Sequence, residues 1–214
     1  MRVAFFSDIH GNLPALEAAI DYAGKIDKYI ILGDVVNYGP WSNECVFFLE
    51  NLKNWIKLKG NHEHYFLNGK CESSNELANI FFDFCYQYFD LKEKIQDYRD
   101  EYLFEDFTCK HTLNKEYIFS DTNIKIEKNF IIGHSHAQYI NSNNGNILVN
   151  PGSVGQNRKL INEINFMTYD TNNKTFFPHT TYYDVDELID KMIDMKYPKV
   201  CIDYYLNKKR KWLE

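Results

Sequence analysis

The amino-acid sequence predicts an α/β fold, and two patterns along the chain favour this class. In the first 60 residues, short apolar runs alternate with segments whose apolar residues recur every three or four positions. This is typical of strands alternating with helices in a largely parallel sheet. The second half is rich in apolar runs separated by Asn/Gly turns, which are typical of hairpins. A chain of 214 residues can bury a full core, so we expect a single domain over residues 1–214.

The first strand is expected at residues 3–6, and a polar segment follows it. Apolar spacing predicts a helix over residues 13–23, with Asn12 in the capping position. Asp8 and His10 are two residues apart, so at the end of a strand both side chains project to the same side. Two interpretations stay open: a capping Asp with a surface His, or a pair of ligands at the carboxyl edge of the sheet.

The same arrangement repeats twice. A strand at residues 29–32 ends in Gly33-Asp34, and a strand at residues 55–58 ends in Gly60-Asn61-His62-Glu63. A helix capped by Ser42 is expected between them. Because the carboxyl ends of parallel strands share one edge of the sheet, the polar side chains of the three junctions should gather there.

The rest of the chain is expected to be helical from about residue 73 to 98 and then rich in strands. The predicted strands cover residues 102–110, 117–119, 130–132, 139–140, 147–149, 164–169 and 175–182, with a turn at 143–146 and a last helix at 185–195. Three of the junctions carry His111, Gly133-His134-Ser135-His136 and the segment 150–156. Of the seven histidines, only His179 lies away from a strand junction.

Taken in order, these motifs resemble those of the calcineurin-like metallophosphoesterases. The resemblance spans residues 1 to about 170 and is strongest to the small bacterial and archaeal phosphodiesterase branch, which shares the Asn-Tyr-Gly-Pro stretch at 37–40 and the Asn-Pro-Gly-Ser-Val-Gly loop at 150–155. It implies a four-layer αββα sandwich of two mixed β-sheets flanked by helices. Within that domain, residues 64–100 would form a helical insertion.

The resemblance also implies two divalent transition-metal ions. Asp8, His10 and His136 would hold one ion, Asn61, His111 and His134 would hold the other, and Asp34 would bridge them. Imidazole, carboxylate and amide donors without a thiolate suit Mn, Fe, Zn, Ni or Co, and we expect Mn first.

The activity that the resemblance implies is hydrolysis of a phosphoric ester, by in-line attack of a metal-bridging hydroxide. The expected substrate is a small phosphodiester, with a phosphomonoester as the alternative. His62 is unused by the metals, so it is predicted to be the general acid; the competing interpretation is a packed core residue. Glu63 stands where the family commonly has Asp and is expected to orient the His62 ring.

Candidate substrate-binding residues are Asn12, Asn150, Gly152, Ser153, Gln156 and Arg158. Each has a second interpretation. Asn12 caps a helix, the loop at 150–156 forms a tight turn or cradles a phosphate with its N–H groups, and Arg158 is either solvated or a phosphate clamp.

The net charge and the composition restrict the kinds of partner that the protein is expected to bind. The net charge of −6 opposes a broad grip on nucleic acid, and the basic run at 208–211 is typical of a solvated end. No apolar run approaches the roughly 20 residues that span a bilayer, and Met1-Arg2 leads directly into a strand, so a cytoplasmic protein without a membrane segment is expected. Five widely spaced cysteines predict no disulfide framework. An assembly of identical subunits stays open.

The competing function is a non-catalytic protein-interaction scaffold on the same fold, as in the retromer-type subunit that resembles this family. The sequence has residues able to bind metal at all seven expected ligand positions. A scaffold has no chemical need for them, so the sequence favours the enzyme.

Overall fold

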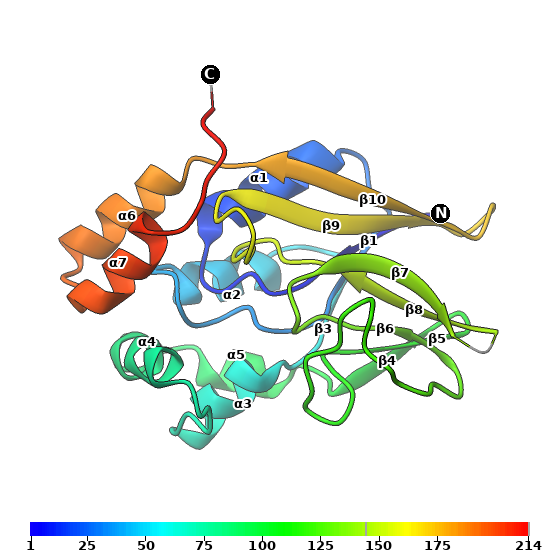
Figure 1. Ribbon diagram of the computed structural model, residues 1–214, viewed down its shortest axis with the longest axis horizontal. Helices are drawn as coiled ribbons and strands as arrows, with labels where there is room; N and C mark the ends of the chain where they lie inside the picture. The colour runs from blue at the N-terminus through cyan, green and yellow to red at the C-terminus, as the bar shows by residue number, and fades with distance from the viewer. Residues whose placement is uncertain (144, 214) are drawn as a thin grey trace.

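The computed structural model describes residues 1–143 and 145–213, and over these residues the chain forms two five-stranded sheets (Figure 1). The first sheet has the order β10-β9-β1-β2-β3 and consists of β1 (Arg2–Phe6), β2 (Lys28–Ile31), β3 (Trp55–Lys57), β9 (Glu163–Asp170) and β10 (Thr175–Tyr182). The second has the order β4-β5-β6-β8-β7 and consists of β4 (Glu101–Phe104), β5 (Phe107–Lys110), β6 (Asn129–Ile131), β7 (Gln138–Asn143) and β8 (Asn146–Pro151). Both sheets mix parallel and antiparallel pairs.

The helices lie mainly on the side of the first sheet (Figure 1). They are α1 (Leu13–Ala23), α2 (Ser42–Glu50), α3 (Asn61–Asn68), α4 (Glu76–Tyr86), α5 (Lys92–Gln96), α6 (Val185–Asp194) and α7 (Lys199–Leu206). Helix α1 lies along β9 and β10, and α4 contacts α7. The predicted α1 has Asn12 as its N-cap, whose side chain accepts a hydrogen bond from the N–H of Ala15.

Successive side chains of β1 point to opposite faces of the sheet, and this explains how the sheets and helices stack. Val3 and Phe5 face the second sheet, where they join Cys109, Ile131 and other residues in the core between the sheets. Phe6, on the opposite face, packs into the larger core beneath the helices. A fully buried strand with both faces apolar is therefore required at this position, because it lies between two cores.

The outer face of the second sheet is covered by the segment over residues 111–128. Ile118 and Ile126 pack there against Leu148, and the hydroxyl of Tyr139 donates to the carbonyl oxygen of Ile118 over 2.9 Å. Two mixed sheets packed face to face, with helices over the outer side of the first, confirm the predicted sandwich.

Some local predictions are wrong. The expected strand over 117–119 is irregular, because Ile118 is fixed by packing rather than by strand pairing. The run 102–110 is the hairpin of β4 and β5, which turns at Glu105 with φ 50°. Ser42 is the first residue of α2 and its Oγ accepts from the N–H of Asn37 at 3.0 Å, so it braces the preceding loop instead of capping the helix. The expected turn at 143–146 includes Asn144, which lies outside the described residues.

Within the described chain, none of the helices has the length and apolar character needed to cross a bilayer. The cysteines Cys45, Cys85, Cys109 and Cys201 are buried in the cores.

Candidate metal centre

The polar residues that follow the strands meet at one edge of the two sheets, and their backbone is unusual. Asp8, His10, Asp34, His134 and His136 all have φ between 52° and 66°. Non-glycine residues rarely adopt this left-handed conformation, and strained residues of this kind cluster at functional sites. The backbone therefore turns immediately after each strand and directs these side chains to a common point.

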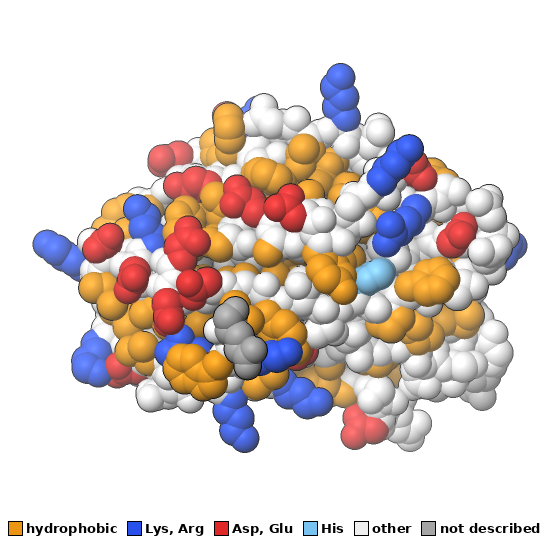
Figure 2. Space-filling view, turned by 90° about the horizontal axis from the view of Figure 1, so that it is seen from above, with side chains coloured by type: hydrophobic (Ala, Val, Ile, Leu, Met, Phe, Trp, Pro, Cys, Tyr) orange, Lys and Arg blue, Asp and Glu red, His pale blue; other side chains and the backbone are white. Residues whose placement is uncertain are grey.

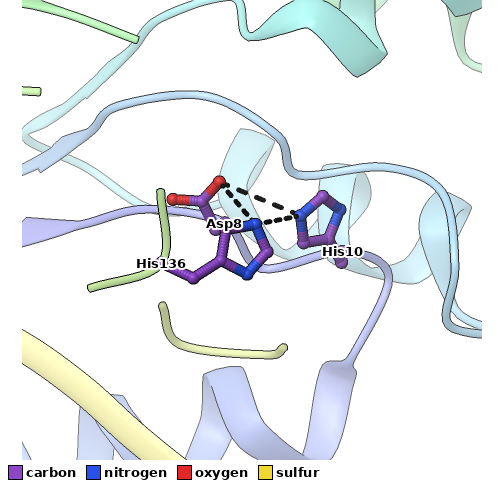
Figure 3. A group of neighbouring side chains, drawn as sticks. All are labelled: Asp8, His10 and His136. Carbon is purple, nitrogen blue, oxygen red and sulfur yellow. Dashed lines mark hydrogen bonds and ion pairs between the residues drawn. The ribbon is translucent and has the colours of Figure 1, made fainter. Parts of the chain in front are cut away.

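The first cluster consists of Asp8, His10 and His136 (Figure 3). The Nε2 atom of His136 lies 3.3 Å from Oδ1 of Asp8 and 3.4 Å from Nε2 of His10. Nδ1 of His136 donates to the carbonyl oxygen of Gln156 over 2.5 Å, which leaves the lone pair of a neutral ring on Nε2. Two acceptors, Nε2 of His136 and Oδ1 of Asp8, thus face each other.

This donor set fits a metal ion. Oδ1 of Asp8 is buried and has no hydrogen-bond partner among the described residues. A cation between Oδ1 and the imidazole lone pairs would satisfy them, whereas an unpaired buried carboxylate oxygen is costly. The bond from His136 to Gln156 is the outer hydrogen bond that commonly orients a ligating imidazole.

The second cluster consists of Asp34, His111 and His134, with Asn61 beside them. Nε2 of His111 lies 3.2 Å from Oδ2 of Asp34, 3.2 Å from Nδ1 of His134 and 3.2 Å from Oδ1 of Asn61. Its Nδ1 donates to the carbonyl oxygen of Leu32 over 2.9 Å. His111 therefore repeats the arrangement of His136.

Asp34 links the clusters. Its Oδ2 lies 3.9 Å from Nε2 of His10 and 3.2 Å from Nε2 of His111. Asp34 also forms a third group, with His10 and His62, whose ligand atoms are close enough to hold an ion. The buried groups are thus adjacent and share the Asp34 carboxylate, which suggests a dinuclear metal site.

Burial sets the charge state of the histidines in these clusters. It lowers the pKa of His10 and His136 well below the usual value and lowers the pKa of His134 to about 3. Burial also opposes charge on His111, but the nearby Asp34 carboxylate outweighs it and raises the pKa of His111 to about 9. Three of the four imidazoles are thus neutral near pH 7 and present lone pairs.

The two carboxyl groups differ. Burial raises the pKa of Asp8 to about 7. Burial also favours the neutral form of Asp34, but the proximity of His111 and His62 overcomes this and holds the pKa of Asp34 well below its usual value. Asp34 is therefore ionised in the protein without metal, whereas the carboxyl group of Asp8 is partly protonated near neutral pH.

His62 lies beside the clusters on the first turn of α3. Its Nε2 is 3.9 Å from Oδ2 of Asp34, and its Nδ1 accepts a hydrogen bond of 2.9 Å from the side-chain amide of Asn37. Burial lowers the pKa of His62, so the ring is neutral near pH 7. With Nδ1 accepting, the ring proton sits on Nε2, the atom that faces the site.

Glu63 does not make the expected contact with the His62 ring. Its carboxylate accepts hydrogen bonds from the backbone N–H groups of Asp34 at 2.8 Å, Val35 at 2.7 Å and Gly60 at 2.6 Å. Glu63 therefore fixes the loop that carries Asp34 to the start of α3. Asn37, which was not among the predicted site residues, takes the place beside the ring; the signals in the sequence were its position three residues after Asp34 and its place in the Asn-Tyr-Gly-Pro stretch at 37–40.

Most of the expected substrate-binding residues are bonded within the protein. Asn12 accepts from Ala15 and donates to the carbonyl of Gly155 over 2.8 Å. The amide of Asn150 donates to the carbonyl of Gly133 over 2.7 Å, and its Oδ1 accepts from the N–H of Gly152. These residues lock the loop after β8 against the junctions that carry the clusters.

Close packing supports the same conclusion for the rest of that loop. Ser153 Oγ donates to the carbonyl of Asp8 over 2.8 Å and accepts from the N–H of Gln156. A Cβ on Gly155 would lie 1.8 Å from the carbonyl oxygen of Ile9, so only glycine fits there. Arg158 differs from the others: it is exposed, and its guanidinium lies 4.8 Å from the centroid of the Tyr117 ring.

Two mixed sheets with buried His and Asp clusters at one edge define a protein of the metallophosphoesterase class. Comparison with known families agrees: the model of the calcineurin-like phosphoesterases matches residues 1–165. The chain belongs to this family, and the resemblance seen in the sequence motifs is confirmed.

Three individual relatives are between 20% and 28% identical to this chain. The chain is 28% identical over 232 aligned positions to the "Uncharacterized protein MJ0912" of Methanocaldococcus jannaschii, with 92% of this chain and 94% of the relative covered. A metallophosphoesterase from Sphaerobacter thermophilus superposes with a TM-score of 0.78 at 22% identity, covering 96% of this chain and 99% of that one. A structure described as a novel archaeal phosphodiesterase superposes with a TM-score of 0.52 at 20% identity, covering 85% and 100%. At these identities, the two structures support the fold.

Proposed function

We propose that the protein is a hydrolase that cleaves small phosphodiesters with the help of two divalent metal ions. The observation that carries this proposal is the position of Asp34 between two buried clusters of imidazole and carboxylate groups. Such a pair of sites suits a displacement at phosphorus, because both the attacking and the leaving oxygen need a nearby positive charge.

In this proposal Asp8, His10 and His136 would hold one ion. Asn61, His111 and His134 would hold the other, and Asp34 would contribute its carboxylate to both. The donors are nitrogen and oxygen without sulfur, which suits Mn first and also Fe, Zn, Ni or Co. When bound, the ions supply an activated water and polarise the phosphoryl oxygens.

His62 acts as the general acid. Its Nε2 faces the site, 3.9 Å from Oδ2 of Asp34, and Asn37 holds the ring in this orientation through Nδ1. The resting ring is neutral, so it must first take up a second proton; a leaving alkoxide that develops near Nε2 would then take a proton from the imidazolium and return the ring to its neutral form. Glu63, Asn12, Asn150 and Ser153 position the loops on which the reacting groups lie.

Arg158 is proposed to contact the substrate. It is exposed and lies on the loop after Gln156, whose carbonyl orients His136. A guanidinium is suited to an anionic phosphate ester, because it donates two parallel hydrogen bonds. Gly152 and Gln156, which the sequence motif suggested as substrate-binding residues, are buried within this loop. The Gln156 side chain is buried beside Tyr205.

A small diester is favoured over nucleic acid and over a monoester. The net charge is −6, and Figure 2 shows acidic side chains gathered over the end of the molecule that carries α6, where Asp184, Asp186, Glu187 and Asp190 are exposed. This surface repels a polyanion. The archaeal structural relative described as a phosphodiesterase supports the diester.

The test is hydrolysis of bis-p-nitrophenyl phosphate with added Mn²⁺, Ni²⁺, Co²⁺ or Zn²⁺, with p-nitrophenyl phosphate as the monoester comparison. We expect metal-dependent turnover and a higher kcat/KM for the diester. The absence of turnover with all four metals contradicts the proposal. Elemental analysis separates the enzyme from the scaffold alternative, because about two equivalents of metal are expected only for the enzyme.

A further inference from the structure

Tyr117 and Arg158 form a stack over one of the clusters. The ring of Tyr117 lies on the ring of His134, with centroids 4.1 Å apart and planes at 15°. The guanidinium of Arg158 is 4.8 Å from the centroid of the same tyrosine ring. Tyr117 belongs to the irregular segment 111–128 and Arg158 to the loop after β8, so two segments far apart in sequence meet at the metal centre.

Among the residues that the structure describes, no carboxylate forms an ion pair with Arg158. Its contact with the Tyr117 ring is its only hydrogen-bond, ion-pair or ring contact found over residues 1–143 and 145–213. Arg210, by contrast, is paired with Asp186. Arg158 is also near enough to the clusters to oppose protonation of His134 and His136. An unpaired guanidinium beside a phosphoesterase site is suited to binding an anion.

A free arginine on an exposed loop samples many rotamers, and ordering it on substrate binding costs entropy. A tyrosine ring held by stacking on a buried histidine gives the guanidinium a fixed surface. Tyr117 is half-exposed, at 50%, so packing in the core does not explain its position on His134.

We propose that Tyr117 is a positioning residue that holds the guanidinium of Arg158 beside the metal centre, where Arg158 binds an anionic oxygen of the phosphodiester. This inference rests on the proposed function. It adds a residue that the sequence motifs did not include, and it assigns binding of the substrate charge to a pair rather than to Arg158 alone.

The test uses Tyr117→Ala, Tyr117→Phe, Arg158→Ala and the double variant Y117A/R158A, each loaded with Mn²⁺. Phe119→Ala is the matched control, since Phe119 is an aromatic residue of the same segment with 40% exposure. For each protein we would measure KM and kcat on bis-p-nitrophenyl phosphate, the metal content, and the Kd for inorganic phosphate by calorimetry.

We expect Arg158→Ala to raise KM and the phosphate Kd by about tenfold, the size of a lost charge-assisted hydrogen bond. Tyr117→Ala should raise both by about two- to fivefold, as expected for a lost cation–π contact, while kcat and the two bound metals are retained. The double variant should match Arg158→Ala, because Tyr117 acts through the arginine. Tyr117→Phe and Phe119→Ala should behave like the parent protein.

Three results would overturn the inference: additive effects in the double variant, a Tyr117→Phe variant as impaired as Tyr117→Ala, or loss of metal in Tyr117→Ala. The first two would show that Tyr117 contacts the substrate itself, and the third that it only supports His134. Failure of the proposed function looks different, because the parent protein would then hydrolyse neither substrate with any metal.

Discussion

The side-chain amide of Asn37 donates to Nδ1 of His62 over 2.9 Å, and this bond decides which ring nitrogen carries the proton. Both residues are buried, Asn37 completely and His62 nearly so. The proton of the neutral ring therefore lies on Nε2, and Nε2 is the ring atom that faces Asp34 and the site from which the proposed general acid acts.

Replacing Asn37 should therefore lower the rate without removing metal. We choose Asn37→Gly, because the φ of 76° would strain an alanine at this position. The variant frees the ring to rotate and to exchange tautomers, and we expect kcat to fall by about 10- to 100-fold. Steady-state kinetics and elemental analysis measure the two effects, and an unchanged kcat would remove Asn37 from the mechanism.

Removing the general acid should have an effect that depends on the leaving group. We expect His62→Ala to retain both metals and to lose about 100-fold or more in kcat for diesters with alkyl leaving groups. The loss for p-nitrophenolate, which leaves without a proton, should be much smaller. Rates for both types of diester check this, and loss of metal from the variant would mean that His62 is a ligand.

Glu63 should contribute to stability rather than to chemistry. Its buried carboxylate accepts from the N–H groups of Asp34, Val35 and Gly60, and each donor left unpaired costs about 1–3 kcal/mol. Glu63→Ala should therefore lower the free energy of unfolding by at least about 3 kcal/mol. Chemical denaturation measures this, with exposed Glu17→Ala as the control. Equal stability of the two variants would contradict the structural role.

Metal binding should strengthen as pH rises. In the metal-free protein, burial raises the pKa of Asp8 to about 7, and the Asp34 carboxylate, working against burial, raises the pKa of His111 to about 9. Protons compete with metal for both groups, so binding releases protons and the Mn²⁺ affinity should increase from pH 6 to 9. Calorimetry in buffers of different ionisation enthalpy counts the protons; an affinity that is flat with pH contradicts the prediction.

The same shifts predict how the stability of the metal-free protein varies with pH. The raised pKa of His111 stabilises the fold fully below the unfolded value of 6.5, and this contribution disappears as pH rises through about 9. Asp8, raised from 3.8 to about 7, destabilises the fold increasingly as pH rises across that interval. The Tm of the metal-free protein should therefore fall between pH 6.5 and 9. A rising Tm over this range would contradict the assignment.

Much of the fold could be predicted because its signals are local. The apolar runs before Asp8, Asp34 and Asn61 form the strands β1, β2 and β3, and α3 begins soon after β3. The histidines at 111, 134 and 136 meet at one sheet edge, as predicted. The continuous apolar run of β1 reflects its position between two cores. These features depend on short-range periodicity, which a sequence displays.

The remaining features depend on contacts between distant segments. Glu63 follows a predicted ligand, yet whether it faces the ring of His62 or the loop of Asp34 depends on how α3 packs against that loop. Asn37 belongs to the Asn-Tyr-Gly-Pro stretch, but that stretch does not reveal its partner His62, 25 residues away. Tyr117 lies in no motif, and its partner His134 is 17 residues away. The left-handed backbone of Asp8 likewise depends on the bonds that the loop after β8 makes to it, and that of His10 on bonds to Asp34 and Gly39.

The most direct test of the two-metal proposal is a titration of the metal-free protein with Mn²⁺ while hydrolysis of bis-p-nitrophenyl phosphate is followed. The shared position of Asp34 predicts that the rate rises until about two equivalents are bound and that Asp34→Asn abolishes this activity. A rate that saturates at one equivalent, or no hydrolysis at any Mn²⁺ concentration, would contradict the account.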